Sequence, residues 1–476
     1  MNSKSILTEG IKETLAIEFL SAEIKNSKWK GKVFMAGGGI RDELLGLDLH
    51  DIDLVIEFPN GGIEFANWLC RKLGIYSSSN PVVFERFGTA KFNLRGVNYK
   101  GQNLSDIDVE CVMTRTEQYD GKTRKPEVAH GTLAQDAERR DFTVNSLMKD
   151  LSTGEILDLT GMGKNDIKTG IVRSAIDPNI IFKEDPLRML RAIRFAVKYK
   201  WSLPLFMIKA IKANAHMLKN ISMERVQDEL NKMLVTGSPD SAIRIIQMTG
   251  LSQYVMPELD LLIGLKQNIY HKWDANKHTL EVLKGVPADL KTRLTALFHD
   301  IGKAQTKTVV DDATHFYEHE DVGEKIARDI MIRLKYPNSI IDAVCAGVKN
   351  HMRLKGAGNE GNIISDKALR KLQAELGDNL EMTLDVMDSD NRAHAAAHAM
   401  PNQISGIRGR LSNLKPINPK RDLPINGNDI MSTLNIKPGP IIKILLAAVE
   451  DATYENPHLS RAEALRIVKD TFEGIK

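Results

Sequence analysis

A glycine-rich turn followed by two aspartates is the most constraining feature of this chain. Gly37 and Gly38 end a predicted strand, and Asp51 and Asp53 follow a short apolar turn. Residues i and i+2 of a strand project to the same face, so the two carboxylates are expected side by side. Adjacent carboxylates repel unless a hard divalent cation neutralises them, and glycines let backbone N–H groups approach a phosphate. The pattern predicts metal-dependent nucleotide chemistry.

Size and composition predict a cytoplasmic protein of several domains. The chain has 476 residues, which is long for one domain, and a net charge of only +3, so any nucleic-acid surface must be local. Cys70, Cys111 and Cys345 lie far apart without a CxxC motif, as in a reducing compartment. The N-terminal sequence has no signal-peptide pattern, and no apolar run reaches the ~18 residues of a membrane span. No membrane partner is expected.

The secondary-structure pattern predicts an α+β fold, with a mixed sheet and helices in an N-terminal head and an all-α body behind it. The strand-like segments VFMAG, DIDLVIE, FGTAKFNL and DIDVECVM fall between residues 32 and 160. From about residue 162 the apolar spacing is helical. The expected domains are 1–160, 161–254, 255–400 and 401–476, and the proline-bearing stretch 415–427 is the best linker candidate.

A third carboxylate is expected from the strand IDVECV. Val109 and Cys111 share one face of this strand, while Asp108 and Glu110 share the other. If the strand pairs beside the first one, either acidic residue could join Asp51 and Asp53. Two metal ions held by such a group would serve the attacking and the leaving oxygen of a phosphoryl-type transfer.

The segment 115–147 concentrates positive charge after the acidic strands. It is either a solvated basic loop or a clamp for a triphosphate and an RNA backbone. Asn145 either hydrogen-bonds a ribose or caps local backbone, and the sequence does not decide between these roles. The basic residues of this segment include Lys122, Arg124, Lys125, Arg139 and Arg140.

A predicted helix in FKEDPLRMLRAIRFA carries a second polar group. Asp185 and Arg188 are three residues apart and are expected on one face. They either form an ordinary ion pair or present their hydrogen-bonding edges to a nucleotide base. Arg191 and Arg194 continue the same side of the helix and are candidates for phosphate contacts.

With these motifs in order, the chain resembles the class II tRNA nucleotidyltransferase and poly(A) polymerase family. The resemblance covers nearly the whole chain and is strongest to the CCA-adding branch with a C-terminal HD domain, which is found in many bacteria. Such enzymes add C, C and A to the 3′ end of tRNA without a nucleic-acid template. The matching segments are Gly37-Gly38, Arg41-Asp42, Leu44-Leu45-Gly46, Asp51-Ile52-Asp53, RKPEV with GTL, RRDFTVN, EDPLRMLRAIRF and ERVQDEL.

The resemblance implies a polymerase-β-like head at 1–160, a helical neck that binds nucleotide and RNA at 161–254, an HD domain at 255–400 and a tRNA-binding tail at 401–476. Asp51 and Asp53 would hold two Mg²⁺ ions, and Glu110, rather than Asp108, would be the third catalytic carboxylate. CTP, ATP and the 3′ end of tRNA are the implied partners. The implied nucleotide-binding residues are Gly37, Gly38, Arg41, Asp42, Arg140, Asp141, Asn145, Asp185, Arg188, Arg191 and Arg194.

The family pattern also implies a loop at 114–131 that is linked to the change from C to A addition. The chain departs from the pattern at three places without losing an implied ligand. Leu47 stands where the family usually has Arg or Lys, Ser146 replaces the usual Ala, and GMGKNDI at 161–167 replaces GGLEDL.

A histidine-rich region between 255 and 400 resembles a metal-dependent HD phosphohydrolase. Neutral imidazoles and carboxylates suit a divalent transition metal or Mg²⁺. The expected ligands are His278, His299, Asp300, His319, His351 and Asp388.

The leading hypothesis is therefore template-independent CCA addition, with an accessory HD phosphohydrolase activity. The alternatives are a poly(A) polymerase, a partial enzyme that adds only CC or only A, and an HD phosphohydrolase with a degenerate head. The intact carboxylates Asp51, Asp53 and Glu110 favour a working head. They also argue against a protein that only binds RNA, because binding alone does not require clustered carboxylates.

Overall fold

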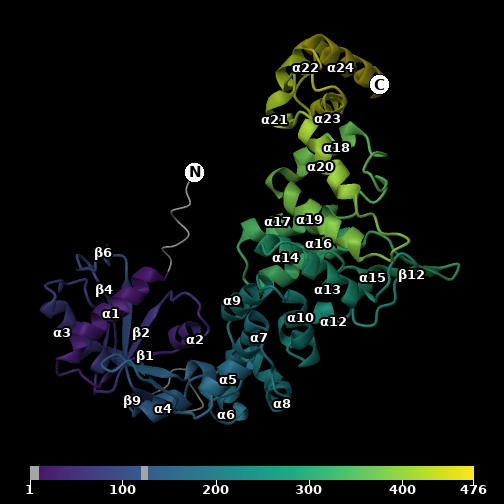
Figure 1. Ribbon diagram of the computed structural model, residues 1–476. Helices are drawn as coiled ribbons and strands as arrows, with labels where there is room; N and C mark the ends of the chain where they lie inside the picture. The colour runs from purple at the N-terminus through teal and green to yellow at the C-terminus, as the bar shows by residue number, and fades with distance from the viewer. Residues whose placement is uncertain (1–9, 119–126, 476) are drawn as a thin grey trace. The chain divides into compact units, whose positions relative to one another are not determined.

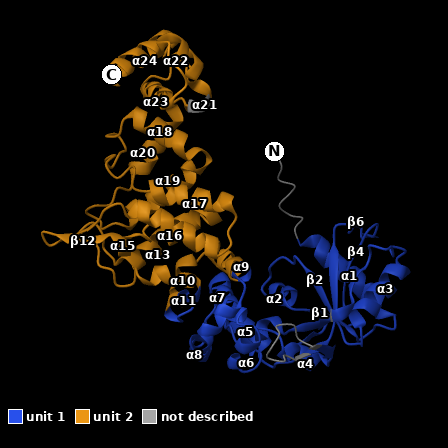
Figure 2. Ribbon diagram, turned by 180° about the vertical axis from the view of Figure 1, so that it is seen from behind, with its two compact units in different colours: residues 1–225, 248–254 blue, residues 226–247, 255–476 orange. Residues whose placement is uncertain are grey.

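The chain folds into two compact units in the computed structural model, which describes residues 10–118 and 127–475. Unit 1 comprises residues 1–225 and 248–254, and unit 2 comprises residues 226–247 and 255–476 (Figure 2). Among the described residues, no helix is long and apolar enough to cross a membrane. The fourfold division at residues 160, 254 and 400 stays a prediction.

Unit 1 is built on a mixed seven-stranded sheet with helices around it (Figure 1), which confirms the predicted head. The strand order is β11-β10-β1-β2-β7-β4-β3. Strands β2 and β7 run parallel, and the other neighbours run antiparallel. The strands are β1 (Val33–Ala36), β2 (Ile52–Ile56), β3 (Val82–Phe84), β4 (Thr89–Asn93), β7 (Asp108–Met113), β10 (Met148–Asp150) and β11 (Ile156–Leu157).

Helix α3 (Gly61–Lys72) packs closely against the sheet. A Cβ atom at Gly62 would come within 2.5 Å of the carbonyl oxygens of Cys111 and Gly88, so only glycine permits this approach. Alternate residues of β7 point to opposite faces: Val109 and Cys111 are fully buried, whereas Asp108 and Glu110 are exposed. One face of the sheet therefore buries Val109 and Cys111, and the other carries the carboxylates beside an apolar cluster that includes Val55 and Ala137.

The remaining elements of the first 225 residues are helices, 3₁₀ turns and small hairpins. The helices are α1 (Ile11–Lys25), α2 (Gly38–Leu44), α4 (Leu133–Glu138), a 3₁₀ turn (Thr143–Asn145), α5 (Gly163–Thr169), α6 (Pro178–Glu184), α7 (Leu187–Tyr199) and α8 (Leu205–Asn214), with a 3₁₀ turn at Ala215–Asn220. The hairpin strands are β5 (Asn98–Tyr99), β6 (Gln102–Asn103), β8 (Arg115–Gln118) and β9 (Glu127–His130).

Unit 2 is helical in its described residues, apart from the hairpin β12 (Lys307–Val310) and β13 (Ala313–Phe316). Residues 354–414 and residues 423–472 contribute to separate apolar cores, and the predicted linker 415–427 falls largely between them. The main helices are α10 (Pro239–Met248), α13 (Ala275–Gly285), α14 (Leu290–Phe298), α16 (His319–Arg333), α17 (Asn338–Asn350), α18 (Asp366–Leu376), α19 (Leu380–Ala393), α20 (Gln403–Asn413), α22 (Gly427–Leu434), α23 (Pro440–Glu455) and α24 (Arg461–Ile475). Helix α9 (Met223–Leu234) begins in unit 1 and continues in unit 2.

Candidate active site

The carboxylates expected to hold metal lie together on the open face of the sheet. Asp53 of β2 is directly opposite Glu110 of β7 in the parallel pair, and Asp51 immediately precedes β2. Partial removal from water, followed by repulsion from Glu110 and Asp51, raises the pKa of Asp53 to about 6, although Arg140 opposes this shift. Divalent cations bound here would relieve the repulsion, so the donor set fits them.

The glycine turn brings the start of α2 against two arginines. Gly37 has φ +79°, a backbone conformation that favours glycine. A Cβ atom at Gly37 would lie 3.3 Å from Nη1 of Arg140, and one at Gly38 would lie 3.2 Å from Nη2 of Arg41. Side chains at these positions would crowd both guanidinium groups, so the glycines keep the arginines close to the backbone.

A chain of buried polar contacts connects the turn to α7. Arg41 forms a bidentate pair with Asp42, with both N–O distances at 2.9 Å, and donates to Asn145 Oδ1 at 2.7 Å. Asn145 Nδ2 in turn donates to Asp141 Oδ1 at 2.9 Å, and Arg191 donates to Asp141 Oδ2 at 2.6 Å. Asn145 therefore links two side chains, and the predicted ribose contact stays a prediction.

Charge balance favours the ionised form of Asp141 within this network. Burial alone would raise the pKa of Asp141, but the charge of Arg191 and the hydrogen bonds from Asn145 and Arg191 lower it below the ordinary value. The guanidinium of Arg41 also lies 4.9 Å from the ring centre of Tyr199, close enough for a cation–π contact. The network is thus fixed before any ligand binds.

Asp136 is a further structural anchor that the sequence analysis did not single out. This fully buried residue of α4 accepts hydrogen bonds from Arg139 at 2.6 Å and from Arg140 at 3.0 Å. Burial raises its pKa, but the charges of Arg140 and Arg139 outweigh that effect and lower it. In the segment QDAERR, Arg139 and Arg140 follow Asp136 by three and four residues, a spacing that predicts ion pairs on one face of a helix.

Asp185 and Arg188 do not lie on one helix as expected. Asp185 follows the end of α6, and its carboxylate accepts from the backbone N–H of Leu187 at 3.1 Å, at the start of α7. Its other oxygen accepts from Arg225 at 2.8 Å. Arg188 donates to Glu184 and to the backbone carbonyl of residue 139. The two residues are therefore not paired with each other through their side chains.

A pocket of about 420 Å³ in unit 1 gathers most of the predicted nucleotide-binding residues. Arg139, Leu187, Phe195 and Arg225 also line it; all four lie in the segments RRDFTVN, EDPLRMLRAIRF and ERVQDEL, but none was predicted as a nucleotide-binding residue. Asp42 lies behind Arg41, and the guanidinium of Arg194 lies 4.7 Å from the ring centre of Phe195. The predicted residues that line the pocket are Gly37, Gly38, Arg41, Asp53, Arg140, Asp141, Asn145, Asp185, Arg188 and Arg191.

Three of the basic residues noted in the sequence, Lys122, Arg124 and Lys125, lie outside the described residues, as does the middle of the expected loop 114–131. Within the described ranges, tight groups of three potential metal ligands occur in unit 2, and the carboxylates of the head do not form such a group.

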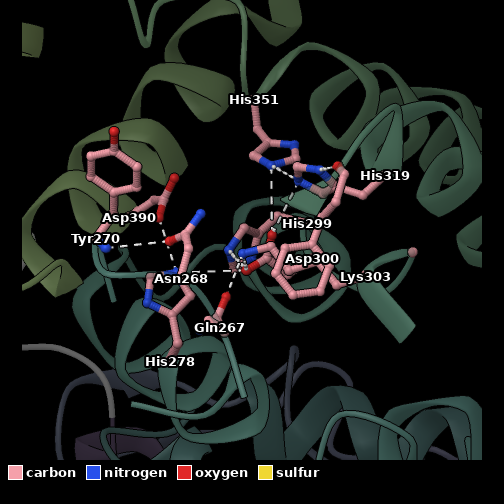
Figure 3. A network of polar contacts seen from close by, with 12 residues as sticks. Gln267, Asn268, Tyr270, His278, His299, Asp300, Lys303, His319, His351 and Asp390 are labelled. Carbon is pink, nitrogen blue, oxygen red and sulfur yellow. Dashed lines mark hydrogen bonds and ion pairs between the residues drawn. The ribbon is translucent and has the colours of Figure 1, made fainter. Parts of the chain in front are cut away.

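Unit 2 contains a buried cluster of histidines around Asp300 (Figure 3). One oxygen of Asp300 lies 3.3 Å from Nε2 of His319 and 3.9 Å from Nε2 of His351. The other oxygen lies 3.3 Å from Nε2 of His299 and 3.7 Å from Nε2 of His278. Two overlapping triads thus share one carboxylate.

Backbone carbonyls fix the orientation of three imidazole rings. Nδ1 of His299, His319 and His351 each lies 2.6–2.9 Å from the carbonyl oxygen three residues earlier. A carbonyl cannot donate a hydrogen bond, so each Nδ1 is the donor and each ring turns its Nε2 toward Asp300. Nε2 of His319 and Nε2 of His351 are only 3.2 Å apart. A cation between these nitrogen atoms fits the donor set.

The electrostatics of the cluster differ from ring to ring. Burial lowers the pKa of His351 and of His278, which favours their neutral forms. Burial also acts to lower the pKa of His299, but the close and charged carboxylate of Asp300, together with the charge of Asp390, outweighs it and raises that pKa. A metal ion would therefore compete with a proton at this ring. The ring of His271 lies edge-on to that of His278, with 4.6 Å between the ring centres. Burial lowers the pKa of His271 to about 2.

The structure corrects the choice of Asp388 as a ligand. Asp388 pairs with Arg392 at 2.9 Å on the outside of α19. Asp390, which is 3% exposed, instead faces the cluster: its Oδ1 lies 3.0 Å from Nε2 of His278, and its Oδ2 pairs with Lys355 at 2.6 Å. Helix geometry explains the error, because residues two apart differ by about 200° around the axis.

Carboxylates that can hold divalent ions beside a pocket lined by arginines supply what nucleotidyl transfer requires, and the names of its relatives assign the protein to the nucleotidyltransferases. Three family models match it: a poly(A) polymerase head domain at residues 33–173, a probable RNA-binding and SrmB-binding site of polymerase A at 207–262, and an HD domain at 275–393.

Named relatives give the same assignment. The chain is 30% identical to a multifunctional CCA protein of Neisseria gonorrhoeae over 66% of this chain and 73% of the relative. It is 29% identical to a CC-adding tRNA nucleotidyltransferase of Thermus thermophilus over 90% and 92%, respectively. The match to a tRNA nucleotidyltransferase of Schizosaccharomyces pombe, at 32% identity, covers 54% of this chain and 56% of that protein. The chain belongs to the tRNA nucleotidyltransferase and poly(A) polymerase family.

The fold agrees with this assignment. The crystal structure of a CCA-adding enzyme of Bacillus stearothermophilus, in complex with CTP, matches with a TM-score of 0.66 at 20% sequence identity. The match covers 97% of this chain and 98% of that one.

Proposed function

We propose that the protein adds C, C and A in turn to the 3′ end of tRNA, using CTP and ATP and releasing pyrophosphate. The observation that carries this proposal is the Asp53–Glu110 pair, which borders the arginine-lined pocket through Asp53. The names of the Schizosaccharomyces and Thermus relatives support tRNA as the acceptor.

The family uses divalent metal ions, and we propose that Asp51 and Asp53 hold two Mg²⁺ ions, with Glu110 as the third carboxylate. Bound Mg²⁺ would activate the attacking hydroxyl and neutralise charge on the triphosphate. The 3′ oxygen of the tRNA bonds to the α-phosphorus, the bond to the β-phosphate breaks, and pyrophosphate leaves as the hydroxyl proton is lost. Positioning and charge account for most of the catalysis.

The arginine-lined pocket would bind the nucleoside triphosphate. Arg140, held by Asp136, and Arg191, held by Asp141, lie where guanidinium groups can bind phosphate oxygens. Gly37 and Gly38 permit close approach of the α2 backbone to a phosphate. The protein network from Arg41 to Arg191 would keep these groups in place during each addition.

Asp185 and Arg188 would select the base in place of a template. Both line the pocket from the junction of α6 and α7. A carboxylate accepts from the exocyclic amine of cytosine or adenine, and a guanidinium donates to ring nitrogen or carbonyl. Their present partners, Arg225 and Glu184, are side chains that a base could replace.

The test is extension of tRNA transcripts that end before CCA, after C and after CC, with CTP and ATP supplied singly and together. Full CCA addition requires both nucleotides and three added residues. Addition that stops after two C residues would instead favour a CC-adding enzyme, the function named for the Thermus relative. Long A tracts on unrelated RNA would favour a poly(A) polymerase. An Asp53→Ala variant that kept full activity would contradict the proposed site.

We also propose that the histidine cluster of unit 2 binds a divalent metal ion and hydrolyses phosphoesters. The Nε2 atom of His299 has no hydrogen-bond partner, although it is fully buried beside Asp300. Lys303 pairs with Asp300 at 2.7 Å, and Lys355 with Asp390, so two ammonium groups border the cluster. Such groups suit a phosphate oxygen next to a metal.

Metal content after dialysis and hydrolysis of bis(p-nitrophenyl) phosphate with Mg²⁺, Mn²⁺, Co²⁺ or Ni²⁺ test this second site. Replacement of His299 and Asp300 by alanine should remove both metal and turnover. Tight metal binding without turnover above that control would leave the cluster a structural site and contradict the hydrolytic role.

A further inference from the structure

A second pocket lies on the open face of the head sheet. It measures about 440 Å³, and its wall includes Glu110, whereas the wall of the arginine-lined pocket includes Asp53. Because Asp53 and Glu110 are direct neighbours in the parallel pair, the catalytic carboxylates separate the two pockets. The lining residues are Phe84, Thr89, Lys91, Glu110, Val112 and Arg115.

Strand register ties this pocket to the reacting centre. Asp53, Glu110, Lys91 and Val82 form one row across β2, β7, β4 and β3. Two residues further along, on the same face of the sheet, Phe84 of β3 lies opposite Thr89 of β4, which lies opposite Val112 of β7. Neighbouring strands are about 4.8 Å apart, so β3 runs about 10 Å from the strand of Glu110. One nucleoside spans this distance.

The far side of the pocket offers an aromatic surface. Phe84 lies on β3, the edge strand of the sheet, and is 50% exposed. An exposed aromatic on a sheet edge is a liability for a protein unless it has a partner, and base stacking on such rings is a common way to hold single-stranded RNA.

Positive charge lies between the aromatic and the carboxylates. Lys91 is the register partner of Glu110 in the strand pair, and its ammonium pairs at 2.9 Å with Asp108, an exposed carboxylate that a phosphodiester could replace. Arg115 of β8 contributes a second cation to the wall. A phosphodiester is the complementary ligand for these groups. The pocket therefore combines a stacking surface, cations and a catalytic carboxylate.

The geometry points to this pocket as the site of the 3′-terminal nucleoside of the RNA acceptor, with its base stacked on Phe84. Its 3′ hydroxyl then faces Glu110 and Asp53, opposite the nucleotide in the arginine-lined pocket. The preceding phosphodiester lies near Lys91. This inference rests on the proposed transfer to an RNA 3′ end and assigns its acceptor site, which requires a place separate from the triphosphate.

The first test compares Phe84→Ala with Val83→Ala in the full-length protein. Val83 is 36% exposed on the same strand but alternates to the other face, so it is a matched control. We expect Phe84→Ala to raise the Kd for a tRNA transcript lacking CCA by at least about 5-fold, the loss of one stacked base, and to leave the KM for CTP unchanged. Phe84→Tyr should retain wild-type affinity, whereas Phe84→Leu, which keeps the apolar volume, should not.

Two further measurements do not depend on turnover. A tRNA transcript with a photoactivatable thiolated base at its 3′ terminus should cross-link within residues 82–91 of the wild-type protein. Lys91→Gln should reduce the slope of log Kd against log salt by about 1. Thermal unfolding of each variant confirms that the head is folded.

The outcomes separate this inference from the proposed function. A wild-type protein that adds no nucleotide to any RNA would contradict the proposed function. A wild-type protein that extends tRNA, with Phe84→Ala and Val83→Ala equal in RNA affinity, would overturn only the acceptor site. Cross-links confined to other segments would overturn it as well.

Discussion

Replacing Asn145 by aspartate should make the stability of the head depend on pH. Asn145 accepts from Arg41 and donates to Asp141 at 2.9 Å, and both Asn145 and Asp141 are buried. Asn145→Asp keeps the acceptor for Arg41 but turns the donor into a second carboxylate oxygen beside Asp141. Two negative charges 2.9 Å apart at an effective dielectric constant of 20 repel by about 6 kcal/mol.

Protonation of the introduced carboxyl group limits this cost. An aspartate with an ordinary pKa of about 3.9 takes up a proton at pH 7 for about 4 kcal/mol and at pH 5 for about 1.5 kcal/mol. The protonated form can again donate to Asp141. Since the folded-state pKa of this group lies above its unfolded value, the variant is most stable at low pH and loses stability as the pH rises. The charge of Arg41 offsets only part of the repulsion between the two carboxylates, because Arg41 is already paired with Asp42.

The matched control is Asn145→Ala, which removes both hydrogen bonds and adds no titratable group. It should cost about 3 kcal/mol, with little change between pH 5 and 8. Urea unfolding can be monitored by tryptophan fluorescence in a Trp273→Phe background. The three remaining tryptophans, Trp29, Trp68 and Trp201, all lie in unit 1, so the signal reports on that unit alone.

The reasoning is refuted if Asn145→Asp loses the same free energy of unfolding at pH 5 and pH 8, or if it is as stable as the wild type at pH 7. The affinity for CTP should follow the same trend, because Arg41, Asp141 and Arg191 line the pocket.

Three further predictions test other parts of the structure. Asp53→Ala should lower the kcat of nucleotide addition by more than about 100-fold while CTP still binds, because the change removes charge stabilisation of the transition state. Quenched-flow extension assays would measure kcat, and an unchanged value would contradict a catalytic role for Asp53. Asp390→Ala should weaken metal binding to unit 2 by about 10- to 100-fold, whereas Asp388→Ala should leave the affinity unchanged. Isothermal titration with Mn²⁺ measures both affinities, and a loss in Asp388→Ala but not in Asp390→Ala would make Asp388 the ligand. Gly62→Ala should destabilise unit 1 by about 1–3 kcal/mol, because its Cβ would lie 2.5 Å from the Cys111 carbonyl oxygen; an unfolding midpoint equal to that of the wild type would show that α3 can move away.

The parts of the head that follow from alternation were predictable from the sequence. Period-two patterning in IDLVI and DVECVM predicted two strands and put Asp108 and Glu110 on one face of the second. The pairing of these strands was only a condition of the prediction, which the structure meets, and the choice of Glu110 came from the family resemblance. The arginine-lined pocket was predictable because its residues fall in a few short motifs with matching order in a known family. The class of fold followed from the change to helical spacing after about residue 162.

Contacts that depend on local backbone turns were not predictable in the same way. Asp185 was assigned to a continuous helix, but Pro186 follows it and α7 begins at Leu187, so its carboxylate meets backbone and Arg225 instead of Arg188. The choice between Asp388 and Asp390 depends on the rotation of α19, which no short motif records. The role of Asn145 depends on two partners that are distant in sequence, Arg41 and the chain around Asp141.

The carbonyl contacts of His299, His319 and His351 have a consequence for how unit 2 exchanges metal ions. Each ring takes its orientation from a backbone oxygen three residues earlier in its own segment, so no ion is needed to align it. Loss of the ion should therefore leave the rings in place and cost no refolding. Exchange between different divalent ions then becomes a matter of cellular supply and dissociation rate, and unit 2 can remain folded while its metal occupancy changes.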